Sequence, residues 1–136
     1  ERILGAVGEA ALGVKNGSQW THDIDTPANK EFVAAYRKAY NRTPTLYASQ
    51  GYDTARLLAS ALKATGGATD PAVLRAELKK ADFASVRGNF AFGSNQHPVQ
   101  DIYIREVVKS ETGFTNKTVK KVFANHVDAY AKDCKM

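Results

Sequence analysis

The passage between two expected helices is Thr43-Pro44-Thr45-Leu46-Tyr47-Ala48-Ser49-Gln50-Gly51-Tyr52-Asp53. Its proline prevents the first helix from continuing, and the second helix is expected to begin near Gly51. Tyr47, Ser49 and Gln50 would therefore lie at the N-terminal mouth of a helix, where backbone N–H groups are unpaired and the helix dipole favours an anion. Because Tyr47 is expected in the loop before this helix, its hydroxyl group would be free to contact a partner.

Three helices are expected in the middle of the chain, at about 26–41, 51–65 and 70–81. Thr26-Pro27 and Asp70-Pro71 each combine a capping side chain with proline at the first helical position. Apolar residues recur at helical spacing in all three. The residues expected to face a core are Phe32, Val33, Tyr36 and Tyr40 in the first helix, Ala55, Leu58, Ala59 and Leu62 in the second, and Val73, Leu74 and Leu78 in the third.

The apolar spacing then changes to the alternation that is typical of strands. Strands are expected at 86–92, 102–108 and 118–123, joined by turns at 93–95 and 111–113, and could form a short antiparallel meander. A helical segment at 2–12, a lone strand from Val14 to Trp20 and a last short helix from Asn125 to Tyr130 complete the pattern. The lone strand must pair either with a member of the meander or with strands outside this chain. We expect an α/β fold and a piece of a larger protein.

Composition excludes several classes of protein. The 136 residues are 43% hydrophobic and 24% charged, as in ordinary globular domains, and no apolar run approaches the roughly 20 residues that cross a bilayer. The net charge of +5 comes from dispersed Lys and Arg, so we expect no nucleic-acid binding. Cys134 would be a free thiol or half of a disulfide with a distant partner. Because the chain begins at Glu1 rather than Met, we expect either a removed leader or a cut from something longer.

Patterns for catalysis and metal binding are missing from the sequence. No serine lies in a Gly-x-Ser-x-Gly motif, and no segment has the spacing of a zinc, calcium or phosphate-loop site. His22-Asp23-Ile24-Asp25 holds three possible metal ligands, but a polar loop before the next helix is the simpler interpretation. We therefore expect a binding protein and no enzyme, with no metal and no cofactor. Trp20 ends a strand and could either pack in the core or line a pocket.

Several segments, in this order, resemble one known family. They are Gly8-Glu-Ala-Ala-Leu-Gly-Val14, Thr26-Pro-Ala-Asn29, Tyr47-Ala-Ser-Gln-Gly-Tyr-Asp53, Val86-Arg-Gly-Asn-Phe-Ala-Phe92 and Asp128-Ala-Tyr-Ala-Lys-Asp-Cys-Lys-Met136. Together they resemble the C-terminal part of type I periplasmic solute-binding proteins of ABC transporters, in the Leu/Ile/Val-binding-like group. The resemblance covers essentially the whole chain.

This resemblance implies part of a two-lobed fold whose lobes close around a solute. Residues 1–22 would end the second lobe, 23–26 would form a hinge crossing, 27–99 would belong to the first lobe, and 100–136 would form a third crossing and the C-terminal tail. It also implies a periplasmic protein that delivers a small solute to the membrane permease of an ABC importer.

The resemblance places a ligand contact at the helix mouth, where Ser49 or its neighbours match a ligand-contacting position. The candidate ligand-binding residues are Tyr47, Ser49, Gln50, Tyr52 and Trp20. The implied ligand carries a carboxylate and is a branched-chain amino acid, an amide or an aromatic acid. A carboxylate is well served by N–H donors and hydroxyl groups in a cleft of low dielectric constant.

Two further expectations remain open at this stage. The alternative function is a receptor-like sensory or regulatory domain of the same fold, which would act through a partner protein instead of an importer. Because one strand is separated from three others, the chain could also pair its strand edges with a second copy, by self-association or by domain swapping.

Overall fold

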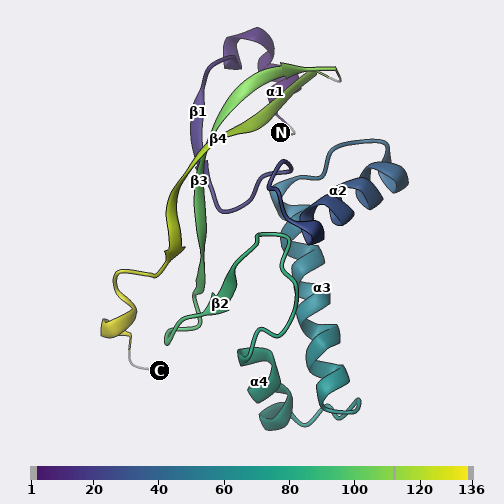
Figure 1. The fold of residues 1–136 in the computed structure, drawn as a ribbon, viewed down its shortest axis with the longest axis vertical. Helices are drawn as coiled ribbons and strands as arrows, with labels where there is room; N and C mark the ends of the chain where they lie inside the picture. The colour runs from purple at the N-terminus through teal and green to yellow at the C-terminus, as the bar shows by residue number, and fades with distance from the viewer. Residues whose placement is uncertain (1–2, 112, 135–136) are drawn as a thin grey trace.

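A computed structural model describes residues 3–111 and 113–134 of the chain. Figure 1 shows a long, twisted sheet on one side and a group of helices on the other. The elements are α1 (Leu4–Val7), a 3-10 turn (Gly8–Ala11), β1 (Lys15–Ser18), α2 (Pro27–Tyr40), α3 (Leu46–Ala64), α4 (Pro71–Lys79), β2 (Phe90–Phe92), β3 (Pro98–Ser110), β4 (Gly113–His126) and a 3-10 turn (Ala131–Asp133).

The central strand of the sheet is β3, and every pairing within the described sheet involves it. It pairs antiparallel with β2 through Phe90 opposite Gln100, and with β4 along nearly its whole length. The expected turn at 93–95 is confirmed, because the Gly93 N–H donates to the His97 carbonyl at 2.8 Å. Thr112, in the other expected turn, lies outside the described residues. The antiparallel meander predicted from the alternating pattern is therefore confirmed.

The lone strand of the sequence analysis finds its partner within the chain. β1 pairs antiparallel with β3, with Lys15 opposite Glu106 and Ser18 opposite Tyr103. Of the two alternatives, pairing with a member of the meander is confirmed and pairing with strands outside the chain is wrong. The separation of this strand from the other three is therefore no reason to expect self-association. The outer strand β4 carries Lys117, Lys120 and Lys121, and such charges oppose pairing of a strand edge with another chain.

Local sequence signals set the ends of α2 and α4 as expected. The Thr26 side chain accepts a hydrogen bond from the Asn29 N–H at 3.3 Å, and proline occupies the first helical position. Asn41 ends α2 in the left-handed conformation, with φ of 49°, which asparagine tolerates well. At the start of α4, Asp70 accepts from two backbone N–H groups at 3.0 Å.

Several other predictions from the sequence are wrong. Of the predicted core face of α3, Ala55, Leu58 and Ala59 are exposed and only Leu62 is half-buried. The buried residues of this helix are Ser49, Asp53 and Ala61 instead. Tyr40 is exposed at the end of α2, and α4 has no fully buried residue. The last short helix does not form, because β4 continues through His126.

One buried cluster joins the sheet to the helices. Its apolar members are Trp20, Ile24, Phe32, Val33, Val86 and Tyr103. At its centre the Asn29 amide oxygen accepts from the Trp20 indole N–H at 2.8 Å, and the amide nitrogen donates to the carbonyls of Thr21, His22 and Ile24 at 3.0–3.3 Å. One side chain of α2 therefore provides hydrogen-bond donors for three carbonyls of the segment that leaves the sheet.

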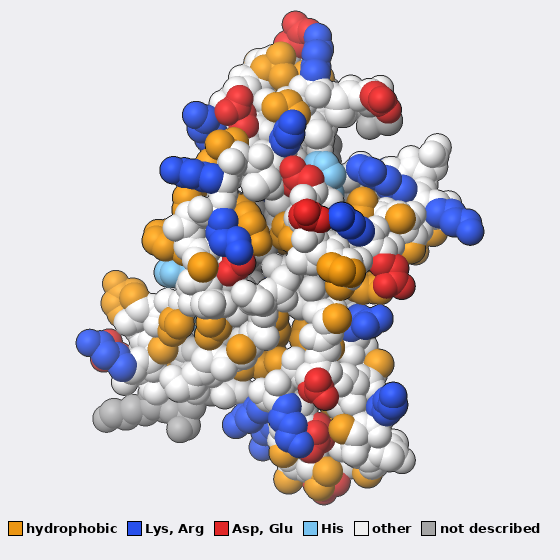
Figure 2. Space-filling view, in the orientation of Figure 1, with side chains coloured by type: hydrophobic (Ala, Val, Ile, Leu, Met, Phe, Trp, Pro, Cys, Tyr) orange, Lys and Arg blue, Asp and Glu red, His pale blue; other side chains and the backbone are white. Residues whose placement is uncertain are grey.

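The surface carries no concentrated charge on the face shown in Figure 2. Lys and Arg side chains are spread over both the sheet and the helices, with hydrophobic side chains scattered between them. Within the described residues, the helices are too short or too polar to cross a membrane. The same residues contain no cluster of three or more His, Cys, Asp or Glu side chains suited to a metal ion.

We expect Asn29→Ala to lower the free energy of unfolding by about 2–4 kcal/mol, because it leaves the Trp20 indole and three buried carbonyls without partners. The exposed Asn89→Ala is the matched control and should change stability by less than about 0.5 kcal/mol. Guanidinium denaturation of both variants measures the difference. Equal stability of the two would contradict the role given to Asn29.

Candidate functional site

The helix mouth identified from the sequence is the first turn of α3. The helix begins at Leu46, five residues before the predicted start, because Thr45 caps it by accepting from the Ala48 N–H at 3.3 Å. Tyr47 is therefore in the first helical turn and not in a preceding loop, which corrects the prediction. The orientation of this turn still leaves backbone N–H groups of α3 without helical partners.

The candidate ligand-binding residues differ in their exposure to solvent and in the hydrogen bonds that they already make. Tyr47 is 79% exposed and Gln50 is half-buried. Ser49 is fully buried, and its hydroxyl donates to the Leu46 carbonyl at 2.7 Å. Trp20 is fully buried in the core beside Asn29. Of the two possibilities left open for Trp20, the structure shows packing.

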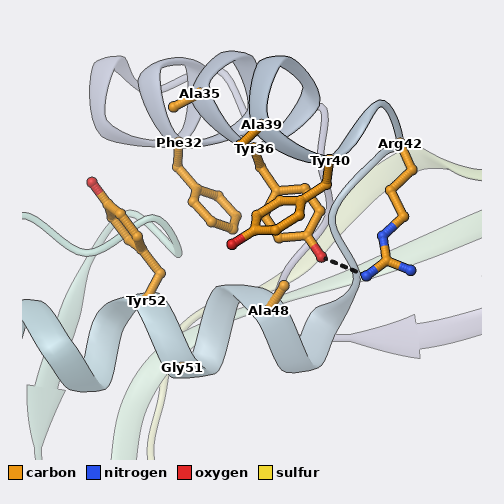
Figure 3. A pocket seen from close by; sticks show the side chains of 9 residues that line it. All are labelled: Phe32, Ala35, Tyr36, Ala39, Tyr40, Arg42, Ala48, Gly51 and Tyr52. Atoms are coloured by element: carbon orange, nitrogen blue, oxygen red, sulfur yellow. Dashed lines mark hydrogen bonds between the residues drawn. The ribbon is translucent and has the colours of Figure 1, made fainter.

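Tyr52, the remaining candidate, lines an open groove between α2 and α3. Its ring lies 4.7 Å from the ring of Phe32, measured between centroids, and Tyr36 and Tyr40 continue the aromatic row along α2. The groove encloses about 600 Å³ and is lined by Phe32, Ala35, Tyr36, Ala39, Tyr40, Arg42, Ala48, Gly51 and Tyr52. Figure 3 shows the aromatic side chains of α2 directed toward the N-terminal half of α3, with Arg42 at one end.

A buried carboxylate that the sequence analysis missed fixes the position of α3. Asp53 accepts from the Ser85 hydroxyl at 2.6 Å, the Val86 N–H at 3.0 Å and the Arg87 guanidinium at 3.0 Å. Arg87 also donates to Gln100 of β3 at 2.9 Å and lies over the Phe90 ring. The helix is thus tied through one ion pair to the sheet. The sequence did carry a signal for this contact, because Asp53 lies four positions after Ser49 and therefore on the same face of the helix.

Two further carboxylates tie down the segments where the chain passes between sheet and helices. Asp23 accepts from the Thr21 hydroxyl and from both the N–H and the hydroxyl of Thr118 on β4. Asp101 of β3 accepts from Lys121 at 2.5 Å and from the Asn125 N–H at 2.9 Å. These bonds hold residues that are far apart in the sequence against β4.

Both carboxylates have a lowered pKa. Burial raises the pKa of Asp101. The hydrogen bonds from Lys121 and from the Asn125 N–H, together with the charge of Lys121, lower it by more, so the pKa lies below its usual value. Burial likewise raises the pKa of Asp23, and the hydrogen bonds from Thr21 and Thr118 outweigh it. Each side chain therefore favours the folded state in its ionised form.

The model of the family described as periplasmic binding protein matches residues 1–113. The chain belongs to the periplasmic binding protein family. Its arrangement of helices and antiparallel sheet matches the type I periplasmic-binding-protein fold, which confirms the expected α/β class.

Named members of the periplasmic binding protein family extend this finding. A Leu/Ile/Val-binding protein homolog 6 from Brucella abortus is 35% identical over 124 residues, which are 88% of this chain and 32% of that protein. A solute-binding protein of an ABC transporter from Rhodopseudomonas palustris BisB5, solved with 3,4-dihydroxybenzoic acid, is 37% identical with a TM-score of 0.82 over 93% of this chain and 35% of its own. A solute-binding protein of an ABC transporter from R. palustris, in complex with benzoate, is 33% identical with a TM-score of 0.82. The match covers 98% of this chain and 36% of that chain.

The periplasmic binding protein chain thus spans about a third of the length of the relatives it matches. The family and its solved neighbours are substrate-binding proteins and not enzymes, which confirms the expectation that the chain belongs to a non-enzymatic class.

We expect Asp53→Asn to destabilise the protein by about 3–5 kcal/mol, because it leaves the Arg87 guanidinium buried without a counterion. The exposed Asp82→Asn, which removes the same charge nearby, is the control and should change stability little. Thermal and denaturant unfolding measure both variants. A small effect of Asp53→Asn would show that α3 is held by other contacts.

Acid should unfold the protein partly by protonating Asp101. A carboxylate with a lowered pKa in the folded state contributes its full stabilisation above the ordinary Asp pKa and loses it as the pH falls through the lower folded value. In Asp101→Asn this part of the acid dependence should disappear, so stability falls less steeply below about pH 4. Exposed Asp133→Asn should leave the dependence unchanged. Parallel acid curves for Asp101→Asn and the unmodified protein would refute this assignment.

Proposed function

We propose that this chain forms part of the solute-binding protein of an ABC importer, and that the solute is a small aromatic carboxylate. The observation that carries the proposal is Tyr47, a large aromatic side chain that is 79% exposed on the first turn of a helix held by a buried ion pair. Among the described residues it has no side-chain partner. An exposed ring on a firmly held element is suited to binding another ring.

The start of α3 offers complementary groups for both ends of such a solute. A carboxylate is favoured near the unpaired N–H groups and positive dipole end of the first turn. The ring would stack on Tyr47, and the Gln50 side chain, which is half-buried on the next turn, could donate to the carboxylate or to a ring substituent. In this proposal Ser49, which is buried and donates to the Leu46 carbonyl, supports the first turn from within.

The solved neighbours that are at least 30% identical and whose ligand is named support an aromatic acid. The neighbours that are 37% and 33% identical to this chain were solved with 3,4-dihydroxybenzoic acid and benzoate, and one that is 30% identical with p-hydroxybenzoic acid. The curated relative at 35% identity is a Leu/Ile/Val-binding protein homolog. An exposed tyrosine favours a flat ring over a branched aliphatic side chain.

The proposed lobe boundaries lie at the segments that Asp23 and Asp101 bind to β4. Asp23 lies in the proposed hinge crossing at 23–26, and Asp101 lies at the start of the proposed third crossing at 100–136, with residues 1–22 in one lobe and 27–99 in the other. Closure of the two lobes would bury the solute against Tyr47. In this proposal the protein is periplasmic and passes the solute to a membrane permease.

Calorimetric titration of the protein at its natural length with 4-hydroxybenzoate, benzoate and leucine tests the proposal. We expect the aromatic acids to bind more tightly than leucine. Tyr47→Ala should weaken aromatic-acid binding by roughly tenfold, which corresponds to about 1.4 kcal/mol, whereas Tyr47→Phe should retain most of it.

Tyr130→Ala is the matched control, because Tyr130 is 75% exposed and lies near the C-terminus. It should bind like the unmodified protein. If no aromatic acid binds, or if Tyr47→Ala and Tyr130→Ala bind alike, the proposal fails.

A further inference from the structure

A basic hollow is lined by residues from the C-terminal end of α2, from the segment that follows it and from the β3–β4 hairpin. It consists of two cavities of about 410 and 470 Å³. Arg37, Thr43, Ser110 and Thr115 line both cavities, and Arg42 lines the smaller one. None of the five candidate residues of the solute site is among the residues that line this hollow.

Two guanidinium groups in this hollow lack a carboxylate partner. Among the described residues, neither Arg37 nor Arg42 takes part in a salt bridge. Their side chains make only long hydrogen bonds of 3.4 Å, from Arg37 to the Thr43 hydroxyl and from Arg42 to the Tyr36 hydroxyl. Figure 3 shows Arg42 reaching Tyr36 with one nitrogen of its guanidinium and the rest of the group directed away. Most of their ten N–H donors are therefore available.

The opposite wall supplies hydroxyl groups from the hairpin. Among the described residues, the Thr115 hydroxyl oxygen is buried from solvent and has no hydrogen-bond partner. A buried hydroxyl without a partner is costly, so a ligand that accepts its hydrogen bond would stabilise the hairpin. Ser110 already donates its single O–H to the Gly113 carbonyl at 3.2 Å, so Thr115 is the hydroxyl donor that this wall offers an anion.

The charge of the hollow favours an anion. Glu111 is the one acidic residue among the described lining residues, and it is exposed at the rim. Two arginines therefore face a single carboxylate, and arginine binds oxyanions through paired, charge-assisted hydrogen bonds. The same positions would also complement the negative end of the α2 dipole. Lys38, which is exposed in the same last turn, also complements the helix dipole, so the dipole does not require arginine at position 37.

We propose that this hollow binds a small oxyanion, a phosphate or a carboxylate, with Arg37 and Arg42 as charge partners and the Thr115 hydroxyl as a donor. Bound there, the anion would join α2 to the β3–β4 hairpin and so stabilise the contact between the helices and the sheet. The inference does not depend on the aromatic solute, because its residues are different.

Differential scanning fluorimetry and calorimetric titration of the natural-length protein, without aromatic acid, test the proposal. Inorganic phosphate, sulfate and acetate are titrated against chloride at constant ionic strength, so that screening alone cannot produce a difference. We expect saturable stabilisation by at least one oxyanion. The phosphate and acetate arms then distinguish the two kinds of ligand.

Charge-matched variants locate the site. Arg37→Gln and Arg42→Gln should each weaken oxyanion binding by at least about tenfold, in the range of a lost charge-assisted hydrogen bond. Lys38→Gln removes the same charge from the same end of α2 and should leave binding unchanged. If all three variants lower binding equally, the effect is general electrostatic attraction, and the proposed site is wrong.

Thr115→Val supplies a readout that charge does not affect. It removes an unpartnered buried hydroxyl at nearly constant volume, so the anion-free protein should be as stable as before or more stable, whereas stabilisation by the oxyanion should fall. Thr115→Ser should preserve that stabilisation. Absence of saturable binding to the unmodified protein, or full binding by Thr115→Val and Arg37→Gln, would overturn the proposal. Unchanged 4-hydroxybenzoate binding in these variants keeps this outcome separate from the test of Tyr47.

Discussion

The buried amide of Asn29 is the contact on which the arrangement of sheet and helices depends. Its oxygen holds the Trp20 indole, and its nitrogen satisfies three carbonyls of the segment that leaves the sheet. The Trp20 carbonyl in turn accepts from Arg105 of β3 at 3.2 Å, so the same point is bonded to the central strand. An apolar residue at position 29 would fill the space but strand four polar groups, which is why an amide is required here.

A second polar contact connects this junction to the proposed solute site. The Asp53–Arg87 pair ties α3 to the turn before β2, and Arg87 continues to Gln100 of β3. α3 is held both by this buried ion pair and by Leu46, Ala48 and Tyr52 at its N-terminal end, which pack against the apolar core. Its first turn, with Tyr47 exposed, is therefore presented by a rigid helix, which limits the conformational entropy lost when a ligand binds.

Sequence reasoning worked where the cause of structure is local. Thr26-Pro27 and Asp70-Pro71 carry their caps within three residues, and the alternation of the strands records which face is buried. It did not work where the cause is distant. The predicted core face of α3 followed its alanines and leucines, whereas Asp53 is drawn inward by Arg87, 34 residues away. Likewise, the exposure of Tyr47 and the burial of Trp20 depend on where Thr45 starts α3 and on Asn29, and neither dependence is visible in a periodic pattern.

The chain thus combines a family fold with a helix mouth that is held in place by buried polar groups. A crystal structure of the natural-length protein with 4-hydroxybenzoate tests this account most directly. The account predicts the ring of the ligand against Tyr47, at the first turn of α3, with Asn29 and Asp53 bonded as described above. A fully bound ligand that leaves Tyr47 in solvent and contacts no residue of that turn would contradict it.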